Sequence, residues 1–506
     1  MIRPRAVEHI LPRRAYETVV GKTCRSDTAS YTDGKQDKRN TTMATNLETK
    51  QPGYVVDAVT TDEETAETAP ATGPRDPHEK IPIGRGTLWQ ALVVAAVFFC
   101  GPGMYSALNA LGAGGLRDPH LVNITSAMGY ALTAVFSFFG GVVINVLGLR
   151  GVLSVGLVSF SLHGAALYCK NKFDVDWFLY FASAVSGFCA AVLWIAQGAI
   201  TLAYPEPGRR GLFITTFYSS ISIGALVGGI IALAFNVKED GAGSITPISY
   251  IPLIAISACG PFVALLLAPP AKVIRTDGLP VKVKKQATPW QEAKKVFGAL
   301  KKKEILLLVP LFIYSQWFLS WEGNFVAVYH SVRGRALGGF LSSVLAILGN
   351  LAFYVCTDRL GWTRRQVVRR GFYIIFTLNS INWIYATVVQ KIYADTHPVG
   401  LDWTQGEYWL SIVLYLYWSF VNNAFQCYMY FLVGTLSDEV EELARYTSVM
   451  KTINTAGIAL GYGVQVKWSM LGSEALIVGL WFIQIIPTWL VVRAVEDDEK
   501  RELASI

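Results

Sequence analysis

Three ionisable side chains interrupt stretches of the sequence that are otherwise apolar. They are His163, Glu322 and Lys451. A charged side chain at the centre of a bilayer costs at least about 2.5 kcal/mol, so each group is a functional candidate if its stretch crosses a membrane. Glu322 and His163 could form a proton relay, and Glu322 could instead contact a solute or serve a structural role. A hydrogen-bonded core histidine is the alternative for His163, and Lys451 is expected to reach the membrane surface with its ammonium group.

Uncharged amides are spread through four of the same stretches. They are Asn109, Gln197, Asn324, Asn422, Asn423 and Gln426. Together with Glu322, the residues Asn109, Gln197, Asn324, Asn423 and Gln426 could line a polar substrate cavity. The alternative is hydrogen bonding between helices, which contributes about 0.6 to 2 kcal/mol for each bond.

The sequence contains none of the spaced motifs that support catalysis. There is no HExxH, no GxSxG and no Walker-type loop, and the seven cysteines show no CxxC spacing. Such cysteines are typical of small buried hydrophobic residues. No enzymatic activity, no cofactor and no metal site is therefore expected.

The distribution of charge predicts the elements that must position these side chains. From Trp89 to Pro269 every Lys, Arg, Asp and Glu falls into five short clusters, which separate six apolar stretches of about 20 residues. Six more follow near 305–330, 336–357, 371–390, 408–435, 447–466 and 475–492. Only 16% of the residues are charged and 52% are hydrophobic. This pattern predicts an all-α membrane protein of twelve transmembrane helices, in which 89–269 and 305–492 each form a six-helix bundle.

The remaining segments are polar. Residues 1–88 are predicted to be a disordered cytoplasmic tail, with a possible alternative start at Met43, and 493–506 a cytoplasmic C-terminal tail. The linker 270–304 is strongly basic and is expected to attract anionic membrane lipid, by about 1 kcal/mol per charge, rather than nucleic acid. Within it, 290–300 has the apolar spacing of a short amphipathic helix, with Phe297 on the apolar face. The excess of Lys and Arg in alternate loops places both termini and this linker in the cytosol.

Two short turns have matching compositions. The first contains Asn145, Gly148 and Arg150, and the second contains Asp358, Arg359, Gly361 and Arg364. In each turn a glycine stands where the chain must reverse and a short polar side chain precedes it by three residues. The match indicates that the two halves are repeats, as in many transporters. For Asn145 and Arg150, simple helix termination is the alternative to a functional role.

The chain resembles the major facilitator superfamily over roughly residues 89–492. It is similar to the fungal members of the branch named after a nematode uncoordinated mutant, whose members resemble ion-channel regulatory proteins. The most specific matches are Gly101 to Gly115, Gly140-Gly141 to Arg150, Trp194 to Gly198 running to Glu206, Asn324, Gln426, and Gly434 to Asp438. The resemblance implies that spans 1, 4, 7 and 10 line a central cavity, and that an acid with basic neighbours braces the cytoplasmic gate. The residues that this implies for the gate are Asn145, Arg150, Asp358, Arg359 and Arg364. This sequence departs from the superfamily signature at Asn145, where an acid is expected, and at Tyr354, where a glycine is expected.

Two functions are consistent with these features. The first is a transporter that moves a small organic solute by alternating access, and a neutral or amphiphilic solute is expected because no charged pair is predicted in the cavity. The second is a non-transporting regulatory or trafficking subunit with a membrane-protein partner, such as a channel or receptor. The membrane is the plasma membrane or the vacuolar membrane.

Overall fold

The computed structural model describes residues 82, 84–137, 139–205, 209–274, 289–437 and 440–496. They belong to the second of the two units into which the chain divides, Ala71–Ile506. The predicted tail 1–88, apart from 82 and 84–88, and the last ten residues, 497–506, lie outside the described part, as do Met43 and residues 275–288 of the basic linker.

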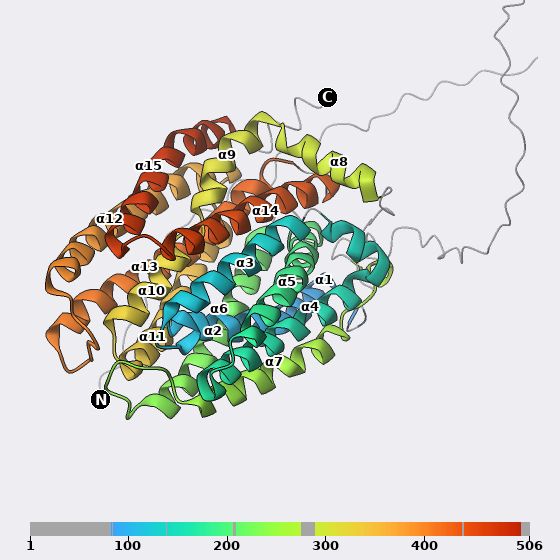
Figure 1. Ribbon diagram of the computed structural model, residues 1–506. Helices are drawn as coiled ribbons and strands as arrows, with labels where there is room; N and C mark the ends of the chain where they lie inside the picture. The colour runs from blue at the N-terminus through green and yellow to red at the C-terminus, as the bar shows by residue number, and fades with distance from the viewer. Residues whose placement is uncertain are drawn as a thin grey trace, which may run out of the picture. The chain divides into compact units, whose positions relative to one another are not determined.

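The described residues are helical almost throughout (Figure 1). Two isolated β-bridges, Gly86 with Ile274 and His330 with Leu401, are the extended pairings among them. The longer helices are α1 (Thr87–Phe98), α2 (Met104–Ala110), α3 (Pro119–Ser137), α4 (Gly140–Phe173), α5 (Trp177–Ala203), α6 (Arg210–Asn236), α7 (Tyr250–Ala264), α8 (Pro289–Leu300), α9 (Lys303–Tyr314), α10 (Leu319–Tyr329), α11 (Val332–Tyr354), α12 (Arg364–Thr396), α13 (Gly406–Gly434), α14 (Val440–Gln465) and α15 (Met470–Ala494). The π-helical turns η1 (Phe99–Gly103) and η6 (Val355–Arg359) extend α1 and α11, and the 3₁₀ turns are η2 (Ala113–Gly115), η4 (Pro247–Ser249) and η5 (Pro270–Lys272).

Nine helical segments in this part of the chain are long and apolar enough to cross a membrane. The helices α3, α13 and α14 contain 19, 29 and 26 residues, which is also long enough for about 30 Å of hydrocarbon at 1.5 Å per residue. The arrangement agrees with the predicted all-α membrane fold. We call the end of the bundle that holds the start of α1 and the end of α15 the terminus end, and the other end the far end.

Both matched turns reverse the chain through a glycine with a left-handed backbone. Gly148 has φ +67° and interrupts α4, and Gly361 has φ +62° between η6 and α12. An L-residue with a side chain pays about 1 kcal/mol or more for that conformation. The glycine assignment made from the sequence is therefore confirmed at both turns.

The two halves pack along two long helix pairs. Helix α6 lies against α11, and α3 lies against α14 (Figure 1). Glycines of α6 allow this approach, since a Cβ at Gly229 would lie 3.0 Å from the Cα of Phe340. Gly112 also packs closely on the other half, since a Cβ there would lie 2.7 Å from the backbone nitrogen of Ala327. Gly112, Gly114 and Gly115 have positive φ and form the turn that ends the first span.

The C-terminal half has an aromatic core that fixes α9, α10, α12, α13 and α15 together. The Trp383 indole donates to the Tyr314 hydroxyl at 2.7 Å, and the Trp321 indole donates to the Met470 carbonyl at 3.1 Å. Trp418 packs on Trp383 with a centroid separation of 4.9 Å. Each buried indole or phenol thus finds a partner for its polar atom, which makes these large side chains suitable for the interior.

The short helix predicted in the basic linker forms as α8. Val296 and Ala299 are buried, but Phe297 is 52% exposed. The prediction of a helix in this segment is confirmed.

Candidate functional site

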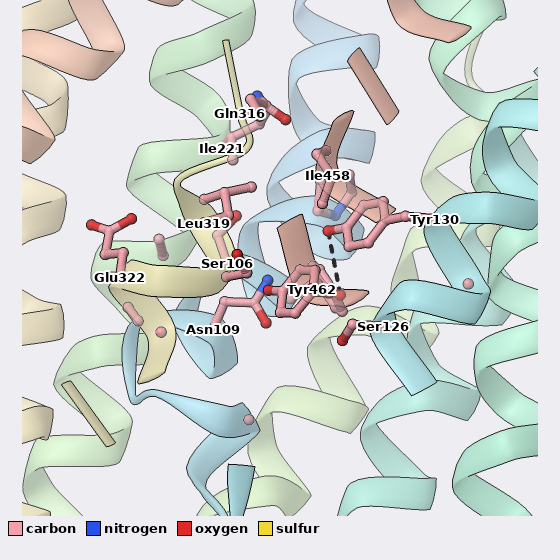
Figure 2. A pocket seen from close by; sticks show the side chains of 18 of the residues that line it. Ser106, Asn109, Ser126, Tyr130, Ile221, Gln316, Leu319, Glu322, Ile458 and Tyr462 are labelled. Atoms are coloured by element: carbon pink, nitrogen blue, oxygen red, sulfur yellow. Dashed lines mark hydrogen bonds between the residues drawn. The ribbon is translucent and has the colours of Figure 1, made fainter. Parts of the chain in front are cut away.

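A cavity of about 300 Å³ lies between the two halves (Figure 2). Residues of α2, α3, α4, α5 and α6 form one wall, and residues of α10, α11, α13 and α14 form the other. Its volume is at the lower end of the range for small-molecule sites, which is about 300 to 1,000 Å³.

Most of the polar residues singled out in the sequence line this cavity. They are Asn109, His163, Glu322, Asn324, Asn422, Asn423 and Gln426. Gln197 is the exception, because it is fully buried inside its own half and its side-chain amide donates to the Thr201 hydroxyl at 2.8 Å. The structure therefore brings these seven side chains to one site and leaves Gln197 away from it.

Tyrosines not singled out in the sequence complete the far-end part of the wall. Tyr130 of α3 and Tyr462 of α14 stack across the two halves with centroids 5.9 Å apart and an interplanar angle of 7°. The Tyr130 hydroxyl, from which a dashed line runs in Figure 2, lies 3.5 Å from that of Tyr105. The Tyr105 ring packs edge-on against His163 with the ring centroids 5.2 Å apart. Aromatic residues on a helix are also common in cores, so the sequence pattern did not distinguish them.

Two asparagines join the halves across this end of the cavity. The amides of Asn123 and Asn324 donate to each other's carbonyl oxygens, both at 3.1 Å. Asn123 is only 5% exposed, so this pair is shielded from solvent.

Lys451 corrects the prediction of an ammonium group at the membrane surface. It is 4% exposed and lines the cavity, with Nζ 4.0 Å from the centroid of the Trp194 ring and 5.2 Å from that of Tyr430. The helix α14 begins at Val440, about two turns before the predicted start of the span at 447, so Lys451 lies inside the bundle. Cation–π contacts of this kind contribute about 2 kcal/mol or more when water is excluded.

Glu322 also lines the cavity, and no hydrogen bond or ion pair joins it to the described residues. Figure 2 shows its carboxylate turned away from Asn109 and Tyr462. Glu322 and Lys451 therefore both belong to the lining, but no ion pair joins them.

The break between α9 and α10 exposes polar atoms of Ser315 to hydrogen bonds from two other spans. The chain leaves the α9 helix at Ser315, which frees its carbonyl oxygen for the amide of Gln426 at 2.7 Å. The Ser315 hydroxyl accepts from the amide of Asn454 at 2.5 Å. Three spans thus meet at one serine, and Gln426 is held by it toward the cavity.

The predicted gate residues lie at the terminus end. Asp358, half-buried in η6, faces the first turn of α6 in the other half, where a Cβ at Gly211 would lie 2.2 Å from its Oδ1. A carboxylate at a helix N-terminus is favourable because of the helix dipole. Arg359 lies 5.9 Å from the centroid of the Tyr354 ring, so the tyrosine that replaces the signature glycine packs under an arginine.

The other gate candidates contact the ends of neighbouring helices. The Arg364 guanidinium donates to the Thr435 carbonyl, and Arg150 donates to the Leu267 carbonyl. Asn145 lies in α4, ahead of the turn at Gly148. Asp358 is therefore the gate candidate that meets the opposite half, whereas Arg150 and Arg364 fasten helix ends within their own half.

Residues that the sequence did not single out close the far end. Arg333 holds the Asp402 carboxylate through two bonds, Nε to Oδ1 at 2.7 Å and a second nitrogen to Oδ2 at 2.6 Å. The Ser331 hydroxyl also donates to Asp402 at 3.0 Å. These hydrogen bonds, that of Arg333 above all, hold the pKa of Asp402 well below its usual range.

The same segment crosses to the other half. The Val332 amide donates to the Gly241 carbonyl at 2.9 Å, and the buried Arg335 guanidinium donates to the Gly243 carbonyl. We call Val332, Arg333, Arg335, Gly241 and Asp402 the far-end clamp. Several hydrogen bonds of the clamp are made to main-chain atoms, between segments that are distant in the sequence. Such bonds do not require particular residue types, so no sequence motif reveals them.

Residues 83–462 match the Major Facilitator Superfamily. The chain is 33% identical over 413 residues to a notoamide biosynthesis cluster protein O' of Aspergillus versicolor, covering 81% of this chain and 89% of that one. It is 29% identical over 395 residues to UNC93-like protein 1 of Arabidopsis thaliana, covering 77% and 86%.

Solved transporter structures share the fold at low sequence identity. A crystal structure of a D-xylose–proton symporter superposes with a TM-score of 0.55 at 11% identity, covering 79% of this chain and 97% of that one. A POT family transporter in complex with 5-aminolevulinic acid superposes with a TM-score of 0.52 at 16% identity, covering 80% and 96%. With the match over most of its length and the cavity between two six-helix halves, the chain belongs to the major facilitator superfamily of membrane transporters, in its UNC93-like branch.

Proposed function

We propose that this protein is a secondary transporter that carries a small organic solute by alternating access of the central cavity. The observation that carries the proposal is a polar cavity bounded at both ends by contacts between the two halves. Asp358 faces Gly211 at the terminus end, and Val332 bonds to Gly241 at the far end. Rocking of one half against the other would release one set of contacts while the other holds.

The terminus end would face the cytosol, because the basic loops lie there. Either the plasma membrane or the vacuolar membrane would suit this orientation. Labelling of Lys172 and Lys284 in sealed cells tests it, and labelling of both from the same side would contradict it.

Glu322 and His163 are the candidates for proton coupling. Both line the cavity, and the Nδ1 atom of His163 has no hydrogen-bond partner among the described residues. Glu322→Gln removes a proton-accepting group while keeping the shape of the side chain. In a proton-coupled transporter it would abolish acid-driven uptake and retain exchange of solute for solute.

The relative from Aspergillus versicolor is named for a biosynthesis cluster. Its name supports an organic product of the cell as the passenger. The lining, which combines amides with aromatic rings, also suits an organic molecule better than a hydrated ion.

Uptake into liposomes that contain the purified protein tests the proposal. A library of fungal culture extracts can be screened by mass spectrometry of the liposome contents. Asp358→Asn is expected to slow uptake several-fold without loss of folded protein, since it weakens a contact made in only one state. Asp395→Asn is the matched control, because Asp395 pairs with Lys391 on the surface. Absence of uptake for every solute, together with a membrane protein that co-purifies at fixed stoichiometry, would favour the regulatory-subunit function instead.

A further inference from the structure

The ammonium group of Lys451 lies in the cavity without a counter-ion. Trp194 of one half and Tyr430 of the other flank it, and no hydrogen bond or ion pair joins Nζ to the rest of the described chain. Glu442, the acid nine residues earlier on α14, is bonded to Lys302. We call Lys451, Trp194 and Tyr430 the lysine cage.

Glu322 is too distant to neutralise this charge. Helix α14 runs alongside α9 and α10, with Gly457 against Ile313 and Gly461 against Trp317. Along these helices Glu322 is therefore level with residue 466, which lies roughly 20 Å beyond Lys451 at about 1.5 Å per residue. At that distance the attraction is only about 0.8 kcal/mol for an effective dielectric constant of about 20, less than the cost of at least about 2.5 kcal/mol for an unpaired charge in a membrane.

The wall beside the lysine cage is suited to an anionic group on an apolar body. Tyr218 lines the cavity there, with its ring 5.5 Å from Tyr430, and its buried hydroxyl forms no hydrogen bond with the described residues. Ile221, Leu319 and Ile458 supply apolar surface (Figure 2). A hydroxyl donor and an ammonium group beside this apolar surface match a carboxylate at one end of an organic molecule.

We infer that the passenger carries a carboxylate, which binds Lys451 in the lysine cage, while its apolar or aromatic body fills the cavity. The carboxylate supplies the missing counter-charge. The inference rests on the proposed function only in taking the cavity as the solute site.

Three probes with one body and different charge test the inference. They are 3-phenylpropanoate, 3-phenylpropanamide and 3-phenylpropylamine. Each is added to the purified full-length protein in detergent, and binding is followed by thermal unfolding and by tryptophan fluorescence. The carboxylate is expected to bind about tenfold or more tightly than the amide, the range for a hydrogen bond to a charged group, and the amine not to bind better than the amide.

Variants separate Lys451 from other causes. Lys451→Met is expected to reduce the preference for carboxylate over amide to about onefold, and Lys451→Arg to retain most of it, since arginine keeps the charge. The control Lys391→Met removes an exposed lysine and should leave the preference unchanged. If Lys451→Met does not fold, the comparison of the three probes on the natural chain and on Lys451→Arg still decides.

Equal responses to the three probes, including no response to any, would overturn the inference. So would a carboxylate preference that survives Lys451→Met. Chloride or phosphate could also stabilise the protein as much as 3-phenylpropanoate does and compete with its binding. That result would overturn the inference, because it would show a site for inorganic anions. If the carboxylate binds but no solute is taken up into liposomes, transport is contradicted and the inference stands. If solutes are taken up equally well by the natural chain and by Lys451→Met, the inference is contradicted and transport stands.

Discussion

Asp402 forms a buried ion pair with Arg333. Its side chain is 6% exposed, and two nitrogens of Arg333 hold both of its oxygens. A buried carboxylate needs such partners, because removing one of them leaves an uncompensated charge. The contact ties the loop before α13 to the start of α11, and so fixes the part of the C-terminal half that meets the other half at the far end.

Asp402→Asn is expected to lower the stability of the protein by about 2 kcal/mol, since it removes charge-assisted hydrogen bonds. The pKa of Asp402 is depressed in the folded chain, so its contribution is fully present above the ordinary value of about 3.9 and is lost as the pH falls through the lower folded value. The difference in melting temperature between Asp402→Asn and the natural chain should therefore be constant from about pH 7 down to about pH 5. A difference that vanishes near pH 6 would contradict this account. Asp395→Asn, at the exposed pair with Lys391, is the control.

The paired asparagines offer a second test on single side chains. Asn324→Ala leaves the buried amide of Asn123 without its partner, at a cost of about 1 to 3 kcal/mol. Because the pair spans the halves, this cost falls on the state that is closed at the far end. A thiol-reactive label on a cysteine placed at Gly241 should react faster in Asn324→Ala than in the natural background.

Most of the polar side chains that were singled out in the sequence line the cavity, but the positions of charged side chains near helix ends were misjudged. Lys451 was expected at the surface because span 11 was predicted to begin at 447, whereas α14 begins at Val440. Glu474, one residue before the last predicted span, is 1% exposed in α15, and neither carboxylate oxygen forms a hydrogen bond with the described residues. Hydropathy defines a helix end only to within a few residues. For a charged side chain near a helix end, an error of that size changes the predicted position from the membrane surface to the protein interior.

At the scale of helices, small residues set how closely the spans approach. Gly457 and Gly461 of α14 lie one turn apart on the face that meets α9 and α10. A Cβ at Gly457 would stand 2.3 Å from the Ile313 carbonyl oxygen, a distance that no folded chain tolerates without a shift of the helix. In lipid, close packing of this kind is a main force that holds helices together.

Gly457→Ala is therefore expected to lower the melting temperature and the yield of folded protein. Gly463→Ala, two residues beyond Gly461 on the same helix, has no atom within 4 Å of its added methyl group. It should be neutral or slightly stabilising, because alanine favours the helix by about 1 kcal/mol over glycine. Fluorescence-detected size-exclusion chromatography of the two variants checks this, and equal behaviour would refute the packing argument.

The apolar stretches predicted the helices well because charge placement in a membrane protein follows lipid exposure directly. The interruptions within helices were harder to foresee. Pro102 lies within the π-helical turn η1, and the break at Ser315 contains no proline. Such breaks are stabilised by partners on other spans, Gln426 and Asn454 in the second case, and those partners are not visible in local sequence.

At the scale of the whole molecule, transport requires that the two ends open in turn. The far-end clamp holds the halves together through main-chain atoms, among them the Val332 amide and the Gly241 carbonyl at 2.9 Å. A covalent link at this point would prevent the far end from opening. It would leave the cavity and the terminus end intact.

Cysteines at Val332 and Gly241, introduced after the seven native cysteines are replaced, are expected to form a disulfide that stops net uptake. Reduction should restore it. Each single cysteine variant is the control and should transport before and after oxidation. Uptake that continues through the cross-linked protein would show that these segments do not move apart.

The placement of Trp194 makes the protein its own optical reporter. The other indoles are concentrated in the C-terminal half, many of them in its aromatic core, where they change little as the halves move as units. Trp194 instead shares the cavity wall with Lys451. Replacing it with phenylalanine and subtracting the two emission spectra would isolate the light from a single ring at the point where a passenger arrives, so occupancy could be followed in real time without any label.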